Sequence, residues 1–366
     1  MLYDPAQFEP LTREPWKPAR IADAIATIVA DADAAFDPAA LWPAHEWDGW
    51  EEPLPLKSLY AGAAGVIWAL EALRRRGHAE SSLDLAAAAL RTLELKRAEP
   101  DFTADEHYHP AALLAGETGP LLVAFQLGPT PALADDLHEL VRANVSNPTD
   151  DVCWGIPGAL LVLAGEPHWA DTAQELASML RDRRSEDGLW RQDDDYRGLG
   201  TLHGAAGNTL ALRRVDPNED TGETATVLAR HAAREHGLAN WPGAPTRPVD
   251  RLQWCTGAPG ILAGAWDYLD EELVLAGAEL IWQAGARDGE KGHGLCHGTS
   301  GNGFALLKAF ARTQDELWLD RARRFAVHAL AQTNRRYSLF TGDVGTALFA
   351  AACLDADARF PILDGL

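Results

Sequence analysis

Apolar residues recur along this chain at the spacing of amphipathic helices. One stripe, at positions i, i+3, i+4 and i+7, comprises Ile21, Ala24, Ile25 and Ile28. Similar patterns occupy residues 81–95, 133–141, 169–184, 221–236, 270–285 and 316–332. Apolar positions three and four residues apart share one face of a helix, so these segments predict seven amphipathic helices.

A second kind of segment alternates with the first. It is a short, nearly all-apolar run such as GVIWAL or GILAGAW, and each run follows the phrase Gly-x-x-Gly. The first glycine of the phrase falls at Gly62, Gly116, Gly155, Gly204, Gly257, Gly298 and Gly342. Seven occurrences at intervals of 39 to 54 residues indicate a structural repeat, with one outer amphipathic helix and one inner apolar helix per unit.

The repeat predicts an all-α fold, an α/α toroid of seven inner and seven outer helices. An open superhelical solenoid would satisfy the same repeat. Closure is favoured because the inner runs are apolar nearly all round, so each needs neighbours on several sides. We expect residues 1–366 to form one such domain, with residues 1–20 as an N-terminal extension.

Composition and charge narrow the possible functions. The net charge of −22 would repel phosphate backbones and anionic lipid, which argues against nucleic-acid and membrane-surface partners. No signal peptide and no apolar run of membrane-spanning length is apparent. The four cysteines are too few for a disulfide scaffold in a chain of 366 residues. A cytoplasmic location is therefore expected.

Reactive side chains gather at one phase of the repeat. If every inner helix begins at its glycine phrase, the residues just before the phrases line one mouth of the ring. Cys255 and Cys296 occupy the same phase of adjacent repeats, and His297 follows directly. Two thiolates and an imidazole form a three-ligand zinc set with one open position, as in catalytic sites. The alternative is two buried free cysteines and a helix-capping histidine. Cys153 shares the phase but is taken as a packing residue.

Several of these motifs resemble one family. GLCHGTSGNG, QWCTGAPG, LHGAAG and SLFTGDVGT are similar to segments of lanthionine synthetase C-like proteins, and the resemblance runs from near Leu59 to the ARFP sequence at 358–361. It implies an α/α toroid with one zinc ion on two cysteines and a histidine, which by position are Cys255, Cys296 and His297. The wording of the motifs is closer to the eukaryotic, glutathione-binding members than to the lantibiotic cyclases.

The resemblance also implies an activity. The family adds a cysteine thiol to dehydroalanine or dehydrobutyrine and so forms a thioether. His203, at the mouth in the fourth repeat, resembles the acid/base histidine that would protonate the α-carbon; otherwise it is a histidine at a helix start. The expected partners are a peptide or protein with a dehydroamino acid and, for the eukaryotic-type members, glutathione.

Three further positions match residues of the family, and each has a simpler alternative. Asp151 would orient His203 or take the thiol proton, or it is a helix cap. Arg251 would stabilise an enolate, or it forms a surface ion pair with Asp250. Lys291 would bind a carboxylate of glutathione or of the substrate, or it is an exposed loop lysine. The metal-like sequence at 105–109 lies outside the reactive phase and is interpreted as a solvated loop.

Two other functions remain open on the sequence. One is a non-catalytic zinc- or glutathione-binding sensor or scaffold, which would bind zinc without turnover. The other is a helical-toroid carbohydrate enzyme, which needs paired carboxylates where this chain has cysteine and histidine. The leading hypothesis is the zinc-dependent enzyme.

Overall fold

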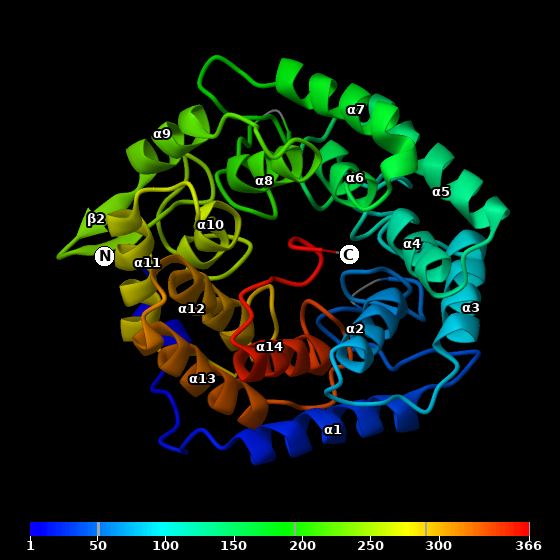
Figure 1. Ribbon diagram of the computed structural model, residues 1–366, viewed down its shortest axis with the longest axis horizontal. Coiled ribbons are helices and arrows are strands. Elements are labelled where there is room, and N and C mark those ends of the chain that lie inside the picture. The colour runs from blue at the N-terminus through cyan, green and yellow to red at the C-terminus, as the bar shows by residue number, and fades with distance from the viewer. Residues whose placement is uncertain (50–51, 194, 290, 366) are drawn as a thin grey trace.

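The computed structural model describes residues 1–49, 52–193, 195–289 and 291–365. Fourteen α-helices of these residues form a ring in which outer and inner helices alternate (Figure 1). The outer helices are α1 (Pro18–Ala35), α3 (Leu85–Ala98), α5 (Pro131–Arg142), α7 (Ala170–Asp182), α9 (Gly222–His231), α11 (Glu271–Ala284) and α13 (Glu316–Ala331). The inner helices are α2 (Ala63–Arg75), α4 (Thr118–Leu127), α6 (Ile156–Leu163), α8 (Ala205–Val215), α10 (Ala258–Ala265), α12 (Thr299–Thr313) and α14 (Asp343–Asp355). Helix α14 packs against α1 and α2, which closes the ring.

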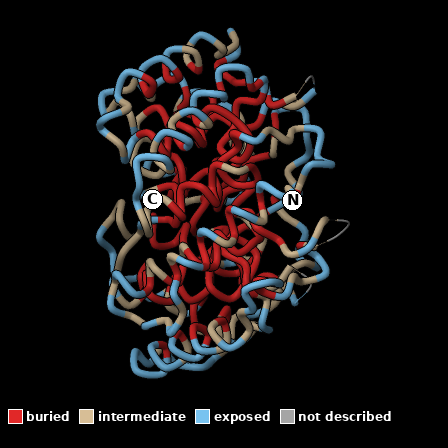
Figure 2. Tube along the Cα trace, turned by 90° about the vertical axis from the view of Figure 1, so that its right-hand side faces the viewer, coloured by how far each residue is buried: buried red, intermediate tan, exposed pale blue. Residues whose placement is uncertain are grey.

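The burial pattern follows from the two kinds of sequence. All eight residues of the inner helix α6 are buried, because it is surrounded by neighbours. The outer helix α1 instead buries one stripe, Ile21, Ile25, Ile28, Val29 and Ala32, and leaves its other face in water. The buried chain accordingly fills the middle of the molecule and the exposed chain its periphery (Figure 2). Removal of this apolar surface from water is the main force that holds the ring together.

Short elements connect the helices. They are the 3₁₀ helices η1 (Pro5–Gln7), η2 (Ala143–Ser146) and η3 (Pro167–Trp169), and the strands β1 (Phe8–Glu9), β2 (Ala233–Glu235), β3 (Leu238–Asn240) and β4 (Ala286–Arg287). Strand β1 pairs antiparallel with β4, so the N-terminal segment is fixed to the chain that follows α11. The first outer helix begins at Pro18, within the range expected to be an extension.

The predicted outer helix over 221–236 is too long by one turn. Helix α9 ends at His231, and the chain then forms the β2–β3 hairpin. His236 and Gly237 make its turn with φ of 52° and 79°, a left-handed pair typical of tight hairpins. The apolar periodicity continues into this segment and concealed the His-Gly turn signal.

The glycine phrases allow the inner helices to start very close to the preceding chain. At Gly204, φ is 149°, and a Cβ atom would lie 2.1 Å from the carbonyl carbon of Gly198. At Gly257, φ is 115°, and a Cβ atom would lie 2.5 Å from the carbonyl oxygen of Arg251. Because no other residue fits such contacts and angles, glycine is required at both helix starts.

The segments before the phrases are joined by backbone hydrogen bonds from one repeat to the next. The N–H groups donate to the carbonyl oxygens as follows: Tyr60 to Leu114 (2.9 Å), Leu114 to Cys153 (3.4 Å), Val152 to Leu202 (3.2 Å), Cys255 to Cys296 (3.3 Å), Cys296 to Phe340 (2.7 Å) and Phe340 to Tyr60 (3.2 Å). The last bond links the seventh repeat to the first. These bonds link six of the seven pairs of neighbouring repeats at one mouth of the ring and align side chains that precede the phrases.

The chain ends inside the ring. After α14, residues 357–365 turn toward the centre, while the N-terminus lies on the opposite face (Figures 1 and 2). Phe360, Ile362 and Leu363 of this C-terminal tail are buried. No helix of the described ranges is both long enough and apolar enough to cross a lipid bilayer.

Candidate metal centre

Three side chains at the mouth bring metal-binding atoms together. The sulfurs of Cys255 and Cys296 and a ring nitrogen of His297 all lie within 4.8 Å of one another. The Cys296 sulfur is 3.6 Å from Nε2 of His297. Both cysteines are buried and His297 is half-buried, so the group is open on one side. This group could hold a metal ion.

The backbone fixes both cysteines. The N–H of Cys255 donates to the carbonyl oxygen of Cys296, and the N–H of Cys296 donates to that of Phe340. Gln253 and Thr256 exchange two backbone hydrogen bonds, of 3.0 and 3.1 Å, and so form a tight turn that carries Cys255 at its tip. The equal phase of the two cysteines in adjacent repeats therefore becomes spatial proximity.

The surroundings favour a negative charge on this pair of sulfurs. A hydrogen bond with Cys296 lowers the pKa of the Cys255 thiol well below its usual value, and His297 and Gln253 act in the same direction. The side-chain amide of Gln253 donates to the Cys255 sulfur over 2.9 Å. Burial raises the pKa of Cys296, since a second thiolate beside the first would be poorly solvated.

The three side chains lie on a cavity of about 520 Å³ at the mouth. All candidate catalytic and metal-binding residues except Lys291 line this cavity. They are Asp151, His203, Arg251, Cys255, Cys296 and His297. Further residues that the sequence reasoning did not select also line it: Tyr60, Phe102, Trp154, Gln192, Asp193 and Tyr196. Tyr60 and Trp154 stand within two residues before the first glycine of a phrase, so the phase of the repeat was the signal that could have found them.

Two simpler interpretations of this region agree with the structure, although both segments border the cavity. Residues 105–109 form an irregular segment that is exposed or half-buried, as expected of a solvated loop, and its Asp105 and His107 line the same cavity as the metal group. Cys153 is a buried residue of the apolar core, as expected of a packing residue, and it also lines the cavity. Burial raises the pKa of Cys153 well above its usual value, so its thiol is neutral.

His203 is held by Asp151. One carboxylate oxygen of Asp151 lies 2.7 Å from Nδ1 of His203, and the other accepts the backbone N–H of Trp154 over 2.7 Å. Asp151 therefore both orients the histidine and fixes the turn before α6, two roles that the sequence left as alternatives. Burial opposes a charge on His203, but the Asp151 carboxylate outweighs it and raises the pKa of His203 above 6.5.

Arg251 and Lys291 both line a second cavity next to the first. This second cavity, of about 450 Å³, shares Arg251 and His297 with the first and is also lined by Lys291. Arg251 is exposed, and it forms no ion pair with Asp250 within 4 Å. Lys291 is half-buried, with its ammonium group 5.5 Å from the centre of the Trp47 ring. The carboxylates of Asp4 and Asp250 line the same cavity, so two cationic and two anionic side chains border the space beside His297.

Comparison with known proteins gives several matches. Residues 51–364 match the family described as "Lanthionine synthetase C-like protein". The glutathione S-transferase LANCL1 of Danio rerio is 35% identical over 130 residues, which are 31% of this chain and 31% of that protein. The LanC-like protein GCL1 of Arabidopsis thaliana is 27% identical over 185 residues, 44% of this chain and 42% of that protein. The matches thus span less than half the length of these curated relatives.

A solved structure shares the fold. A nisin cyclase superimposes with a TM-score of 0.60 over 91% of this chain and 94% of its own, at 15% identity. At that identity the likeness concerns the arrangement of helices, and the ring of alternating inner and outer helices is common to both.

Proposed function

Because the chain belongs to the lanthionine synthetase C-like family, we propose that it is a zinc-dependent enzyme that adds a thiol to a dehydroamino acid residue. The observation that carries this proposal is one cavity that contains both the Cys255, Cys296 and His297 group and the His203–Asp151 pair. A thiol-binding centre and a proton donor on the same cavity are what the addition needs.

The donor set fits zinc. Two sulfurs and one imidazole nitrogen are ligands that zinc prefers, and three protein ligands leave one position for a substrate. Around tetrahedral zinc such atoms stand about 3.5–4 Å apart, which agrees with a group whose atoms lie within 4.8 Å of one another. A zinc ion bound there would lower the pKa of a coordinated substrate thiol and so supply a thiolate at neutral pH.

The remaining steps belong to the chain itself. The thiolate sulfur forms a bond to the β-carbon of the dehydro residue, and the electron pair of the double bond moves to the α-carbon and its carbonyl. His203, whose protonated form is favoured because Asp151 raises its pKa, gives its proton to the α-carbon. The proton lost by the thiol restores His203, so the net reaction adds S–H across the double bond.

Two cationic side chains near the metal group support roles in charge stabilisation. Arg251 lines the cavity and would stabilise the developing enolate. Lys291 lines the adjoining cavity and would bind a carboxylate of the thiol substrate. The Danio rerio relative is named a glutathione S-transferase, which supports glutathione as that thiol. Glutathione carries two carboxylates, to which a cationic side chain would bind. A dehydroamino acid in a peptide or protein is the proposed electrophile.

A direct assay tests this function. Purified protein is incubated with a dehydroalanine peptide, with and without glutathione, and the products are identified by mass spectrometry. We expect a thioether adduct with wild-type protein and a loss of rate of roughly 100- to 10,000-fold in His203→Asn, which removes the proton donor. Zinc content should be unchanged in this variant. Activity of His203→Asn within a few fold of wild type would remove His203 from the mechanism, and intact zinc without adduct in wild type would favour a sensor or scaffold.

The Asp151→Asn variant should change the pH dependence of the rate. The carboxylate is the main group that raises the pKa of His203, so without it the effect of burial, opposed only by Cys255 and Asp105, weighs more and that pKa falls. Since the reaction uses protonated His203, the rate declines as the pH rises through this pKa. The declining limb of kcat should therefore move to lower pH in Asp151→Asn. Profiles of kcat between pH 5 and 9 measure the shift, and superimposable limbs would contradict the pairing.

A further inference from the structure

Four aromatic rings follow one another in a column. Tyr60 and Phe340 have their ring centroids 5.2 Å apart and stack at 12°. Phe340 is 5.3 Å from Trp254, and Trp254 stacks on Phe360 at 4.9 Å and 9°. Tyr60 lines the mouth cavity. Phe360 lines a hollow of about 250 Å³ formed with the C-terminal ends of α2 and α4, on the opposite face.

Both cysteines of the metal group are attached to this column. Trp254 directly precedes Cys255 in the chain, so the packing of its ring restrains the backbone that bears this thiol. The carbonyl oxygen of Phe340 accepts the N–H of Cys296 over 2.7 Å. The backbone of each cysteine is therefore joined to a residue of the column. The indole N–H has no hydrogen-bond partner in the described part of the chain, so packing alone holds the ring.

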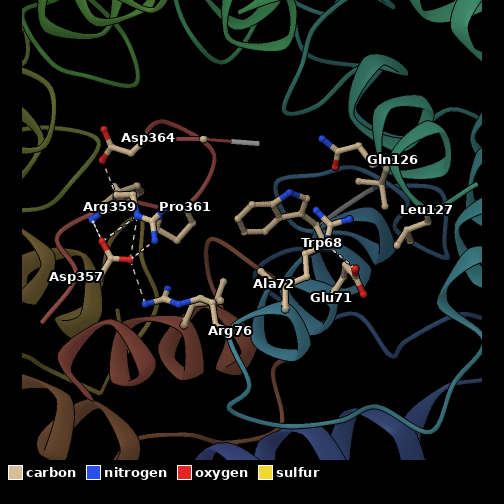
Figure 3. A pocket seen from close by; sticks show the side chains of 15 residues that line it. Trp68, Glu71, Ala72, Arg76, Gln126, Leu127, Asp357, Arg359, Pro361 and Asp364 are labelled. Atoms are coloured by element: carbon tan, nitrogen blue, oxygen red, sulfur yellow. Dashed lines mark hydrogen bonds and ion pairs between the residues drawn. The ribbon is translucent and has the colours of Figure 1, made fainter. Parts of the chain in front are cut away.

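Phe360 is the last ring of the column, at the end away from the mouth cavity. It belongs to the C-terminal tail, residues 357–365. The Asp364 carboxylate accepts the N–H of Phe360 over 2.7 Å and pairs with Lys308 and Arg214. Asp357 pairs with Arg359 and Arg76 (Figure 3). The tail is thus fastened to three inner helices, α2, α8 and α12, through Arg76 at the end of α2, Arg214 and Lys308.

We propose that the C-terminal tail is a positioning element of the metal centre, in which Phe360 holds Trp254 and thereby sets the distance between Cys255 and Cys296. This inference rests on the proposed function only in taking these cysteines as zinc ligands. Residues that support ligands without touching the metal reduce the ordering that binding requires, and their loss typically weakens metal affinity by about 10- to 100-fold. Without the Phe360 ring, a void opens under the indole and the ligand loop relaxes into it.

The test compares two equally buried phenylalanines. Phe360→Ala removes the lower ring of the column, and Phe325→Ala removes a ring of α13 that faces Trp282 at 6.5 Å. Zinc affinity is measured by chelator competition, and the cobalt-substituted proteins are compared by their absorption bands. We expect zinc affinity at least about tenfold lower and altered cobalt bands for Phe360→Ala, wild-type values for Phe325→Ala, and partial recovery in Phe360→Leu. Equal affinity in the two alanine variants would overturn the proposal.

A second variant covers the case in which Phe360→Ala does not fold. Asp364→Asn weakens the attachment of the tail and leaves the column full. We expect zinc affinity reduced by a few fold in this variant, and unchanged affinity in both Asp364→Asn and Phe360→Leu would count against the tail. Failure of the proposed function would be seen in the wild-type protein, as an absence of bound zinc or as bound zinc without thiol addition. The comparison of zinc affinity among the variants tests the role of the tail alone.

Discussion

Cys255→Ala and His297→Ala are each expected to abolish stoichiometric zinc binding and, with it, thiol addition. Either change leaves two of the three donor atoms that now lie within 4.8 Å of one another. Zinc affinity should fall by more than about 100-fold, beyond the 10- to 100-fold typical of residues that only support a ligand. Metal content by elemental analysis after dialysis measures this directly.

Cys153→Ala is the matched control for the ligand variants. Its thiol lies on the same cavity and is also buried, but it is not part of the three-donor group. It should retain one zinc per chain and most of the activity. Full zinc content in both Cys255→Ala and His297→Ala would show that the ligands are assigned wrongly, and loss of zinc in Cys153→Ala would show that the set is incomplete.

Truncation after residue 336 is expected to prevent stable folding. The deletion removes α14, which packs against α1, α2, α12 and α13, and so exposes apolar faces on both sides of the gap. It also removes Phe340. The N–H of Phe340 donates to the carbonyl oxygen of Tyr60 in the first repeat, and its own carbonyl oxygen accepts the N–H of Cys296. An open solenoid would lose one neighbour and stay folded as a shorter array. Thermal melting followed by circular dichroism distinguishes the two cases.

Complementation is the control for the truncation. When residues 1–336 and 337–366 are co-expressed as separate fragments, the lost contacts can re-form, and a cooperative unfolding transition should return. A soluble, cooperatively melting 1–336 fragment on its own would contradict the importance of closure. Failure of both the fragment and the pair would indicate that the chain connection itself is needed for folding.

The sequence was most informative where local pattern and repeat agree. Each inner helix starts at its Gly-x-x-Gly phrase, because that phrase is a local signal for a close backbone approach. The phase of the repeat placed Cys255, Cys296 and His297 together, and the motifs identified the family, which the match over residues 51–364 confirms. The roles of His203, Asp151, Arg251 and Lys291 stay predictions, although the first three line the cavity with the metal group.

The features that were missed depend on contacts between distant residues. The chain around 105–109 reaches the mouth because buried Lys96 binds the Asp101 carboxylate over 2.6 Å and the carbonyl oxygen of Ala115 over 2.8 Å. Asp101 in turn accepts the backbone N–H groups of Lys57 and Ser58. No periodicity in the sequence reports such an anchor. The stacking of Phe360 on Trp254 joins positions that are far apart in the chain, and nothing near either residue predicts it.

The aromatic column also bears on how substrates would reach the site under the proposed function. Trp254, Phe340 and Phe360 are buried, and the stack to which they belong runs from the mouth cavity at Tyr60 to the hollow at Phe360. If the protein adds a thiol to a dehydro residue as proposed, both reactants would enter the mouth cavity from the same side, and the thioether product would leave by that side. A folded protein would then serve as the electrophile only with its dehydro residue on an exposed loop that reaches into this cavity.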